Sequence, residues 1–432
     1  MPVNKRLAYQ KVYMENECKH KNKYDNSRDL QIWLWSNRPA IKASADFIFN
    51  KMKNAGLVNK LNPNRLKNHL KVILTDLYVC HSEDNKRYIS ISLNRNDYFT
   101  PTYFKKIFLN YKYLTLVIKY LTEQKYIEFK RGFYSKNGGR KSRIKSSQKL
   151  LRLFKKYEKP CGVILSRKPP VILKDSNKNE IDYDFDSPEV RPMIRNINKI
   201  NKHILEHTID VLDFTEEVVT ENMYKNNNKY HRTFNNSSFQ QGGRFYGHWS
   251  QNIKSDKRRL ITIDNNRTVE LDYSCLHISM LYGLIGQTPP EGDLYKLVTI
   301  PCEYRKVIKK AVNIALNADN KKSAMAAIYG EIISFCQETG LPFIRPKILL
   351  SEIYTVHNDI EQYFCSGYGV ILQYYDSYIA EKIMLTLGDE GICCLCIHDS
   401  FIISEQYRDR LYDLMMNYFY EIFNFYPKIH LY

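Results

Sequence analysis

Two aspartates stand at the ends of apolar segments that lie far apart in the chain. Asp272 ends the segment VELD (269–272), whose alternation puts its acidic side chains on the face opposite the apolar ones. Asp399 occupies the turn HDS between the apolar runs ICCLCI and FIIS. Two carboxylates at neighbouring strand ends can hold two divalent cations about 3.5 to 4 Å apart, an arrangement that supports phosphoryl transfer. The pair predicts a site for two Mg²⁺ ions, or Mn²⁺, with Asp272 and Asp399 as ligands and catalytic residues.

A basic helix is expected between the two aspartates. The segment YRKVIKKAVNIALNA (304–318) has apolar residues at helical spacing, and Arg305 and Lys309 share one of its faces. Two cations one turn apart can bind a triphosphate and offset the charge that develops during phosphoryl transfer. Each feature has a simpler explanation by itself, because Asp favours turns and helix caps and basic pairs are common on solvated faces. Their combination in one chain favours the chemical interpretation.

The order of these segments resembles motifs A, B and C of the family A DNA polymerases and of the related single-subunit RNA polymerases of phages and mitochondria. Asp272, Tyr273 and the following serine resemble motif A, and Arg305 and Lys309 resemble the triphosphate-binding pair of motif B. HDSF, which contains Asp399, resembles motif C in the form found in the RNA polymerase branch. The resemblance implies a nucleotidyltransferase that uses two metal ions and nucleoside triphosphates.

Two further segments extend the resemblance over residues 242–432. GGRFYGHW resembles the segment that precedes motif A in the RNA polymerase branch, where its arginine, here Arg244, lies near template and primer. ILQYYDSYIAEKIMLTLGDEG resembles the helix that packs ahead of motif C, with Gln373 as a candidate nucleic-acid contact. The resemblance also implies that His398 contacts nucleic acid and that Tyr273 lies at the nucleotide site.

Two positions depart from the family pattern, and both concern nucleotide selection. Asn317 stands where motif B has a tyrosine that helps to check the nucleotide. His277 stands where motif A of the DNA polymerases has a glutamate that blocks the ribose 2′-hydroxyl. The bulk of an imidazole favours deoxynucleotides, although the ring can also form a hydrogen bond with a hydroxyl. The interval between Asp272 and Asp399 is shorter than usual in the family, so we expect small fingers, no exonuclease domain and limited fidelity.

The expected fold class is α+β, with three parts. Residues 241–432 would form a polymerase-like right-hand palm with an antiparallel sheet and small helical fingers, as the resemblance implies. Residues 161–240, rich in Asn, Lys and turn formers around one helix near residues 190–211, would form a connector or thumb-like region. Residues 1–160 would form a basic, helical domain that binds DNA.

The N-terminal part has the pattern of a winged helix. Apolar residues recur at helical spacing in segment 111–126, and the strand-like segments IEFKRGFY and SRIKSS flank a glycine-containing tip. TPTYFKKIFLNY (100–111) would supply the preceding helix, so that the 111–126 helix enters a DNA groove while the hairpin contacts phosphates. The hairpin residues predicted to contact DNA are Lys130, Arg131, Lys136, Arg140, Lys141 and Arg143. The alternative is a packing domain with ordinary solvated charges, but a surface of that kind usually mixes signs.

The charge of the whole chain also indicates a polyanionic partner. Its 65 Lys and Arg residues exceed its 46 Asp and Glu residues by 19, which favours nucleic acid over a membrane surface. No apolar run approaches the roughly 20 residues that a membrane span needs, and the N-terminus lacks the apolar core of a signal peptide. The ten cysteines are irregularly spaced, as in proteins of a reducing compartment. We therefore expect a soluble, cytoplasmic protein without a membrane partner.

Three functions compete on this basis. The leading hypothesis is a nucleotidyltransferase that extends a nucleic acid chain, a DNA polymerase or primase-polymerase of a phage, plasmid or mobile element rather than an RNA polymerase. The alternative is a non-catalytic DNA-binding replication initiator on a polymerase-like scaffold, because a fold does not guarantee a function. A metal-dependent hydrolase built on His398 and Asp399 is disfavoured, because the flanking runs resemble strands, not helices. Template dependence, priming mode, DNA sequence preference and oligomeric state stay open.

Overall fold

Helices and mainly antiparallel strands build both units of the chain, which confirms the predicted α+β class. The computed structural model describes residues 26–59, 61–95, 110–135, 138–159, 164–166, 168–212 and 227–431. The chain divides into one unit that spans Met1–Lys168 and a second that spans Pro169–Tyr432. No helix within the described ranges combines the length and the apolar character that crossing a membrane requires.

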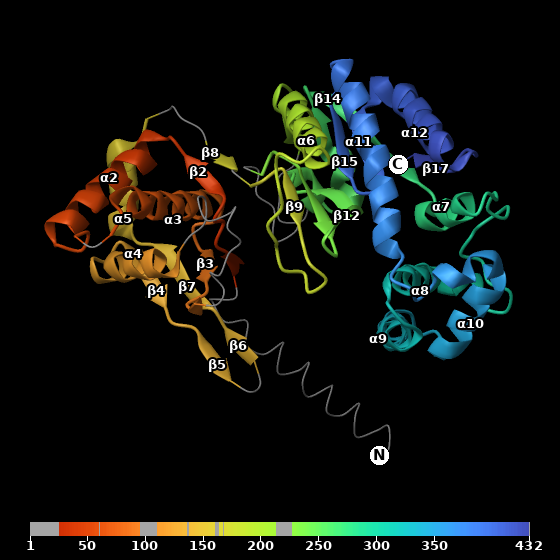
Figure 1. Cartoon of the computed structure of the whole chain (residues 1–432). Coiled ribbons are helices and arrows are strands. Elements are labelled where there is room, and N and C mark those ends of the chain that lie inside the picture. The colour runs from red at the N-terminus through yellow and green to blue at the C-terminus, as the bar shows by residue number, and fades with distance from the viewer. Residues whose placement is uncertain are drawn as a thin grey trace. The chain divides into compact units, whose positions relative to one another are not determined.

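The N-terminal unit packs helices against a four-stranded sheet (Figure 1). Its elements are β1 (Ser27–Asp29), β2 (Leu34–Ser36), α2 (Pro39–Asn54), α3 (Pro63–Glu83), β3 (Tyr88–Ile91), α4 (Tyr111–Glu123), β4 (Ile127–Lys130), β5 (Phe133–Ser135), β6 (Gly138–Arg140), β7 (Ser142–Ser146), α5 (Gln148–Tyr157) and β8 (Ile164–Ser166). The sheet has the order β1-β3-β7-β4, and the β5–β6 hairpin lies between β4 and β7 in the chain. The helix and the two strands predicted from residues 111–146 are confirmed.

α4 shows why the periodic segment becomes a helix. Leu114, Val117 and Leu121 recur at helical spacing and are fully buried in the core of the unit. Asn110 caps the helix, because its side chain accepts a hydrogen bond from the backbone N–H of Lys112. The helix expected at residues 100–111 falls mostly on residues outside the described part of the chain.

The C-terminal unit is built around a six-stranded antiparallel sheet. Its elements are β9 (Val171–Leu173), α6 (Val190–Leu205), β10 (Ile209–Val211), β11 (His231–Asn235), β12 (Ser238–Tyr246), β13 (Ile261–Ile263), β14 (Asn266–Tyr273), α7 (Leu276–Leu284), α8 (Arg305–Asn317), α9 (Lys321–Thr339), α10 (Pro346–Val356), α11 (Gly369–Asp389), β15 (Cys394–Ile397), β16 (Ser400–Ser404), α12 (Arg408–Phe423) and β17 (Ile429–Leu431). The sheet has the order β10-β13-β14-β16-β15, and β17 also pairs with β14. Residues 169–212 and 227–240 belong to this unit and contribute strands and α6 to it.

The helices of the C-terminal unit form two groups (Figure 1). α11 packs on β12, β15, α6 and α12, and so covers the strands. α8, α9 and α10 pack on one another, and α8 also contacts α11. The buried residues of α8, among them Val307, Ala311 and Ala315, recur at helical spacing, which leaves its basic residues exposed.

Candidate active site

Strand pairing brings Asp272 and Asp399 to the same end of the central sheet. β14 and β16 are antiparallel in a register that sets Asp272 opposite Ser400, and Asp399 precedes Ser400 in the two-residue turn after β15. The backbone N–H of Tyr273 extends this pairing, because it donates to the Asp399 carbonyl at 3.4 Å. The structure therefore brings together the two predicted catalytic residues.

The backbone is unusual next to both aspartates. His398, the first residue of the turn, has φ +61°, and Cys275, which precedes α7, has φ +51°. Residues with side chains adopt this region rarely, and two-residue hairpins that need it at the first position prefer Gly. Strained backbone that the surrounding structure holds in place is a property of functional sites. Here it occurs directly before Asp399 and three residues after Asp272.

The charge of the Asp272 carboxylate is disfavoured where it lies. Burial, together with the neighbouring Asp399 carboxylate, raises the pKa of Asp272 to about 7, while Lys309 acts in the opposite direction. The Oδ1 atom of Asp272 is buried and accepts no hydrogen bond from the described residues. A buried anionic oxygen without a donor is destabilising unless a cation binds it.

The two carboxylates suit magnesium bound together with a phosphate ligand. Mg²⁺ keeps several water ligands and is bound by one or two carboxylates plus substrate phosphates. Within the described ranges, no three or more His, Cys, Asp and Glu side chains gather in a way that could hold a metal ion. Asp272 and Asp399 therefore fit a site that water and a phosphate-bearing ligand would complete.

A pH dependence follows from the raised pKa of Asp272. Cation binding requires the ionised carboxylate, so we expect the affinity for Mn²⁺ to rise as the pH increases through about 7. Because this folded-state pKa exceeds the ordinary value of 3.8, the stability of the metal-free protein should fall as the pH rises from about 4 to 7. Electron paramagnetic resonance of free Mn²⁺, titrated with protein at several pH values, measures the affinity.

The control for this pH dependence is Asp264→Asn. Asp264 lies in the β13–β14 turn of the same sheet and is exposed, so the variant should keep the wild-type profile. Asp272→Asn should lose it. An affinity that does not change between pH 6 and pH 8 in the wild type would show that Asp272 does not bind the cation.

Lys309 of α8 lies close enough to Asp272 for its charge to lower the pKa of that carboxyl. Its neighbours Lys306 and Lys310 form ion pairs with glutamates of α9. Lys309 is exposed and forms no ion pair within 4 Å in the described part of the chain. The predicted triphosphate-binding lysine is thus available next to the carboxylates.

Arg305, one turn before Lys309, is bound by an exposed carboxylate. Its Nε and Nη2 atoms lie 2.6 and 3.1 Å from the two carboxylate oxygens of Asp293. This hydrogen bonding raises the pKa of Arg305 and lowers that of Asp293. The two side chains are 51% and 36% exposed, and such pairs contribute at most about 1 kcal/mol. A phosphate, which binds Arg strongly, can therefore replace Asp293.

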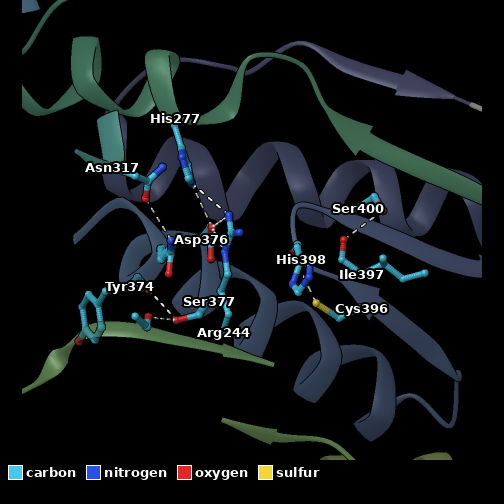
Figure 2. Close-up of polar contacts among 12 residues, drawn as sticks. Arg244, His277, Asn317, Tyr374, Asp376, Ser377, Cys396, Ile397, His398 and Ser400 are labelled. Carbon is cyan, nitrogen blue, oxygen red and sulfur yellow. Dashed lines mark hydrogen bonds and ion pairs between the residues drawn. The ribbon is translucent and has the colours of Figure 1, made fainter. Parts of the chain in front are cut away.

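Arg244, His277 and Asp376 form a polar cluster (Figure 2), and the charge of Asp399 acts on its arginine. Asp376 Oδ2 accepts hydrogen bonds from Arg244 Nε at 2.8 Å and from Arg244 Nη2, and it lies 3.2 Å from His277 Nε2. Burial opposes the charge of Arg244, but Asp376 outweighs it and, with a contribution from Asp399, raises the pKa of the guanidinium. The resemblance predicted Arg244 and His277, whereas Asp376 was missed. Its one signal was an acidic residue inside a largely apolar helical segment.

The residues of the C-terminal unit that were predicted to contact the nucleotide or nucleic acid are at least partly exposed, with one exception. Gln373 Nε2 lies 3.5 Å from Asn317 Oδ1, so α11 and the end of α8 meet there. The ring of Tyr246 contacts His398 edge to face, with centroids 5.4 Å apart. Burial, followed by Arg244, lowers the pKa of His398.

Tyr273 is the exception, because its side chain lies in the core. Alternation along β14 directs it to the face opposite Asp272, where its hydroxyl donates to the Met415 carbonyl at 2.7 Å. Its ring packs near Phe401 and Phe419. This placement leaves only the backbone of Tyr273 for the predicted nucleotide contact.

A groove of about 250 Å³ lies along the face of the sheet that carries Asp272. Glu270, which shares this face, and Arg258 line the groove. Arg258 Nη1 and Ser400 Oγ donate to the same oxygen of Glu270, at 2.7 and 2.5 Å. Arg259, also on the groove, is exposed. The groove thus has both cationic and acidic lining residues, and the charges of Arg258 and Glu270 act on Asp272.

The basic hairpin residues lie in the N-terminal unit, and their surroundings differ. Lys130 and Arg131 are exposed at the end of β4. Lys136 lies outside the described residues. The remaining three are Arg140, whose guanidinium lies over the Phe133 ring, Lys141, which pairs with Asp29 at 3.1 Å, and Arg143, which donates to the Lys141 carbonyl. Arg131 is therefore the residue of this set best suited to a test of phosphate binding.

A scan against protein-family models found no match to this chain, and a search of curated proteins found none either. The chemical interpretation of the site therefore depends on its own residues, on their geometry and on the order of the motifs in the sequence.

Proposed function

We propose that the protein is a nucleotidyltransferase that extends a nucleic acid chain with nucleoside triphosphates. One observation carries the proposal. Asp272 Oδ1 is buried and accepts no hydrogen bond from the described residues, and the charges of Asp399 and Lys309 both act on this carboxyl group. Two acidic groups and a cation in one place suit transfer of a nucleotidyl group from a triphosphate. The order of the motifs supports a DNA polymerase or primase-polymerase of a phage, plasmid or mobile element.

The predicted residues have separate tasks in this proposal. Asp272 and Asp399 would hold Mg²⁺ or Mn²⁺, which activates the 3′-hydroxyl and stabilises the leaving pyrophosphate. Lys309, and Arg305 after its release from Asp293, bind the triphosphate and offset its charge. The residues assigned to template and primer are Arg244, Gln373 and His398, with Arg258 and Arg259 along the groove.

The arrangement of the C-terminal unit supports an interpretation as palm and fingers. Its antiparallel sheet carries both carboxylates at one end. The helical group α8–α10 bears Lys309 and Arg305 and packs against α11 through α8. In this interpretation the sheet is the palm and the helical group is a small set of fingers.

The N-terminal unit would deliver the enzyme to DNA as a winged helix. The chain order of α3, β3, α4, β4, a hairpin and β7, with β3 beside β7 and β7 beside β4, suits that motif. α4 would lie in a groove of the duplex, while the residues next to the hairpin contact phosphates. The excess of positive charge in the chain supports this role.

Arg131→Ala should weaken DNA binding to a similar extent on all sequences. A lost phosphate contact removes roughly one unit from the slope of log affinity against log salt concentration. Fluorescence anisotropy with a labelled duplex, measured at several salt concentrations, gives this slope. Lys202→Ala on α6 is the control, because Lys202 is an exposed lysine of the C-terminal unit that pairs with Glu206. An unchanged slope for Arg131→Ala would remove this residue from the interface.

Extension of a labelled primer tests the proposed function. The protein is supplied with Mg²⁺ and either dNTPs or rNTPs, with and without a template. Elongation that needs Mg²⁺ and a triphosphate is the expected result. No elongation under any priming condition, with DNA binding intact, would instead favour a non-catalytic replication initiator. The presence of both carboxylates and both motif B cations argues against that alternative.

A further inference from the structure

Asp376 joins three elements of the C-terminal unit through a single carboxylate oxygen. It belongs to α11, and its side chain is 1% exposed. Its Oδ2 atom accepts hydrogen bonds from Arg244 of β12 and contacts His277 of α7 (Figure 2). Its other oxygen, Oδ1, is buried without a partner in the described part of the chain. A buried carboxylate of this kind is retained only when its contacts are firmly held.

The imidazole of His277 has its Nε2 atom engaged inside this cluster. Nε2 lies 3.1 Å from Arg244 Nη2 and 3.2 Å from Asp376 Oδ2. This nitrogen is therefore not available for a hydrogen bond with the hydroxyl group of a ligand. At this edge the ring can act on a neighbouring ligand only by steric exclusion.

The cluster also lies within electrostatic reach of the carboxylate pair. His277 is the second residue of α7, which follows the strand that ends with Asp272 and Tyr273. The charge of Asp399 acts on Arg244 and on His398. His277 stands five residues after Asp272, at the position that the resemblance assigns to the sugar of a nucleotide whose phosphates lie at Asp272, Asp399 and Lys309.

We infer that Asp376 sets the selectivity for deoxynucleotides by holding the imidazole of His277 in place. This inference rests on the proposed function and names a positioning residue for it, because Asp376 acts through His277. A locked side chain can exclude a 2′-hydroxyl, whereas one that is free to turn admits it. Loss of the Asp376 carboxylate should therefore relax the choice of sugar more than it slows the reaction.

The test compares Asp376→Asn with Glu381→Gln as a matched control. Glu381 lies on the same helix and forms a buried ion pair with Arg232 of β11. Each variant removes one buried negative charge from α11, but Asp376 alone of the two contacts His277. Single-nucleotide insertion with dNTP and rNTP gives kcat and KM for both sugars.

The expected result is a ratio of dNTP to rNTP efficiency that falls about tenfold or more in Asp376→Asn, mainly through a lower KM for rNTP. His277→Ala should show the same relaxation, and the double variant should relax selectivity no further than either single variant. Glu381→Gln should keep the wild-type ratio. If Asp376→Asn does not fold, His277→Ala still tests whether His277 selects the sugar. This variant should fold, because it leaves the Arg244–Asp376 pair intact.

Three results would overturn the inference, and they can be told apart. If wild type extends primers and His277→Ala or folded Asp376→Asn keeps the wild-type ratio, the inference fails while the proposed function stands. If the ratio of dNTP to rNTP efficiency falls equally in Glu381→Gln, the inference also fails, because the loss of any buried charge would then explain the effect. If wild type does not extend primers with either sugar, the proposed function and the inference fail together.

Discussion

Replacing Asp399 with asparagine should lower the rate of primer extension by about a thousandfold or more, with the protein still folded. The variant removes one of two charges that would hold the metal ions, and metal-ion stabilisation of the transition state amounts to several kcal/mol. Asparagine suits the turn, because it favours the same backbone positions as aspartate. Loss of the like charge should also allow the pKa of Asp272 to fall from about 7.

The measurement is single-turnover extension of a labelled primer, with DNA affinity determined in parallel. Asp264→Asn is the matched control, because Asp264 lies in another two-residue turn of the same sheet, between β13 and β14, and takes no part in the site. It should extend primers at the wild-type rate. Extension by Asp399→Asn within tenfold of wild type would contradict a catalytic role for this carboxylate.

Asp76→Ala should destabilise the N-terminal unit by about 3 to 5 kcal/mol. Asp76 and Arg28 form an ion pair at 2.5 Å with side chains 0% and 1% exposed, and Asp76 also accepts the backbone N–H of Gln31 at 2.9 Å. Removal of the carboxylate leaves a buried guanidinium without its main counter-charge. Glu83 is a second carboxylate near Arg28, but it lies 3.8 Å away and its side chain is 21% exposed, so it offsets the charge less well than Asp76.

Hydrogen exchange of the α3 amides, followed by mass spectrometry, measures this loss as a lower free energy of opening. The control is Asp46→Ala, because Asp46 pairs with Lys67 on the surface of the same unit, with side chains 47% and 40% exposed. Surface pairs contribute up to about 1 kcal/mol. Similar effects of the two substitutions would show that the Arg28–Asp76 pair does not stabilise the unit beyond an ordinary surface pair.

Local patterns in the sequence were enough to predict many of the elements that carry the site. Periodic apolar residues predicted helices over 111–126 and 304–318, which the structure has at Tyr111–Glu123 and Arg305–Asn317. Two apolar runs around HDS predicted the β15–β16 hairpin. These predictions succeed because the burial of one helix face, or of a whole central strand, requires a regular spacing of apolar residues within a short segment. The resemblance of the motifs added the expectation that Asp272 and Asp399 lie together, which the strand register bears out.

Contacts between distant residues could not be predicted in this way. Asp376 is a single acidic residue whose partners, Arg244 and His277, come from other elements. The engagement of Arg305 by Asp293 depends on the path of a loop that has no periodic pattern. Such pairs are decided by tertiary packing, and no local rule of spacing identifies them.

The pairing of β14 has a consequence for how the protein is made. Leu271 pairs on one side with Phe401 of β16 and on the other with Leu431 of β17, so two neighbours of the strand come from much later in the chain. Pairing of distant segments must overcome loop-closure entropy, and proteins rich in it fold slowly. During translation, β14 is therefore made before β16 and β17 and cannot yet pair with them. The strand that bears Asp272 is completed late, after most of its unit has emerged.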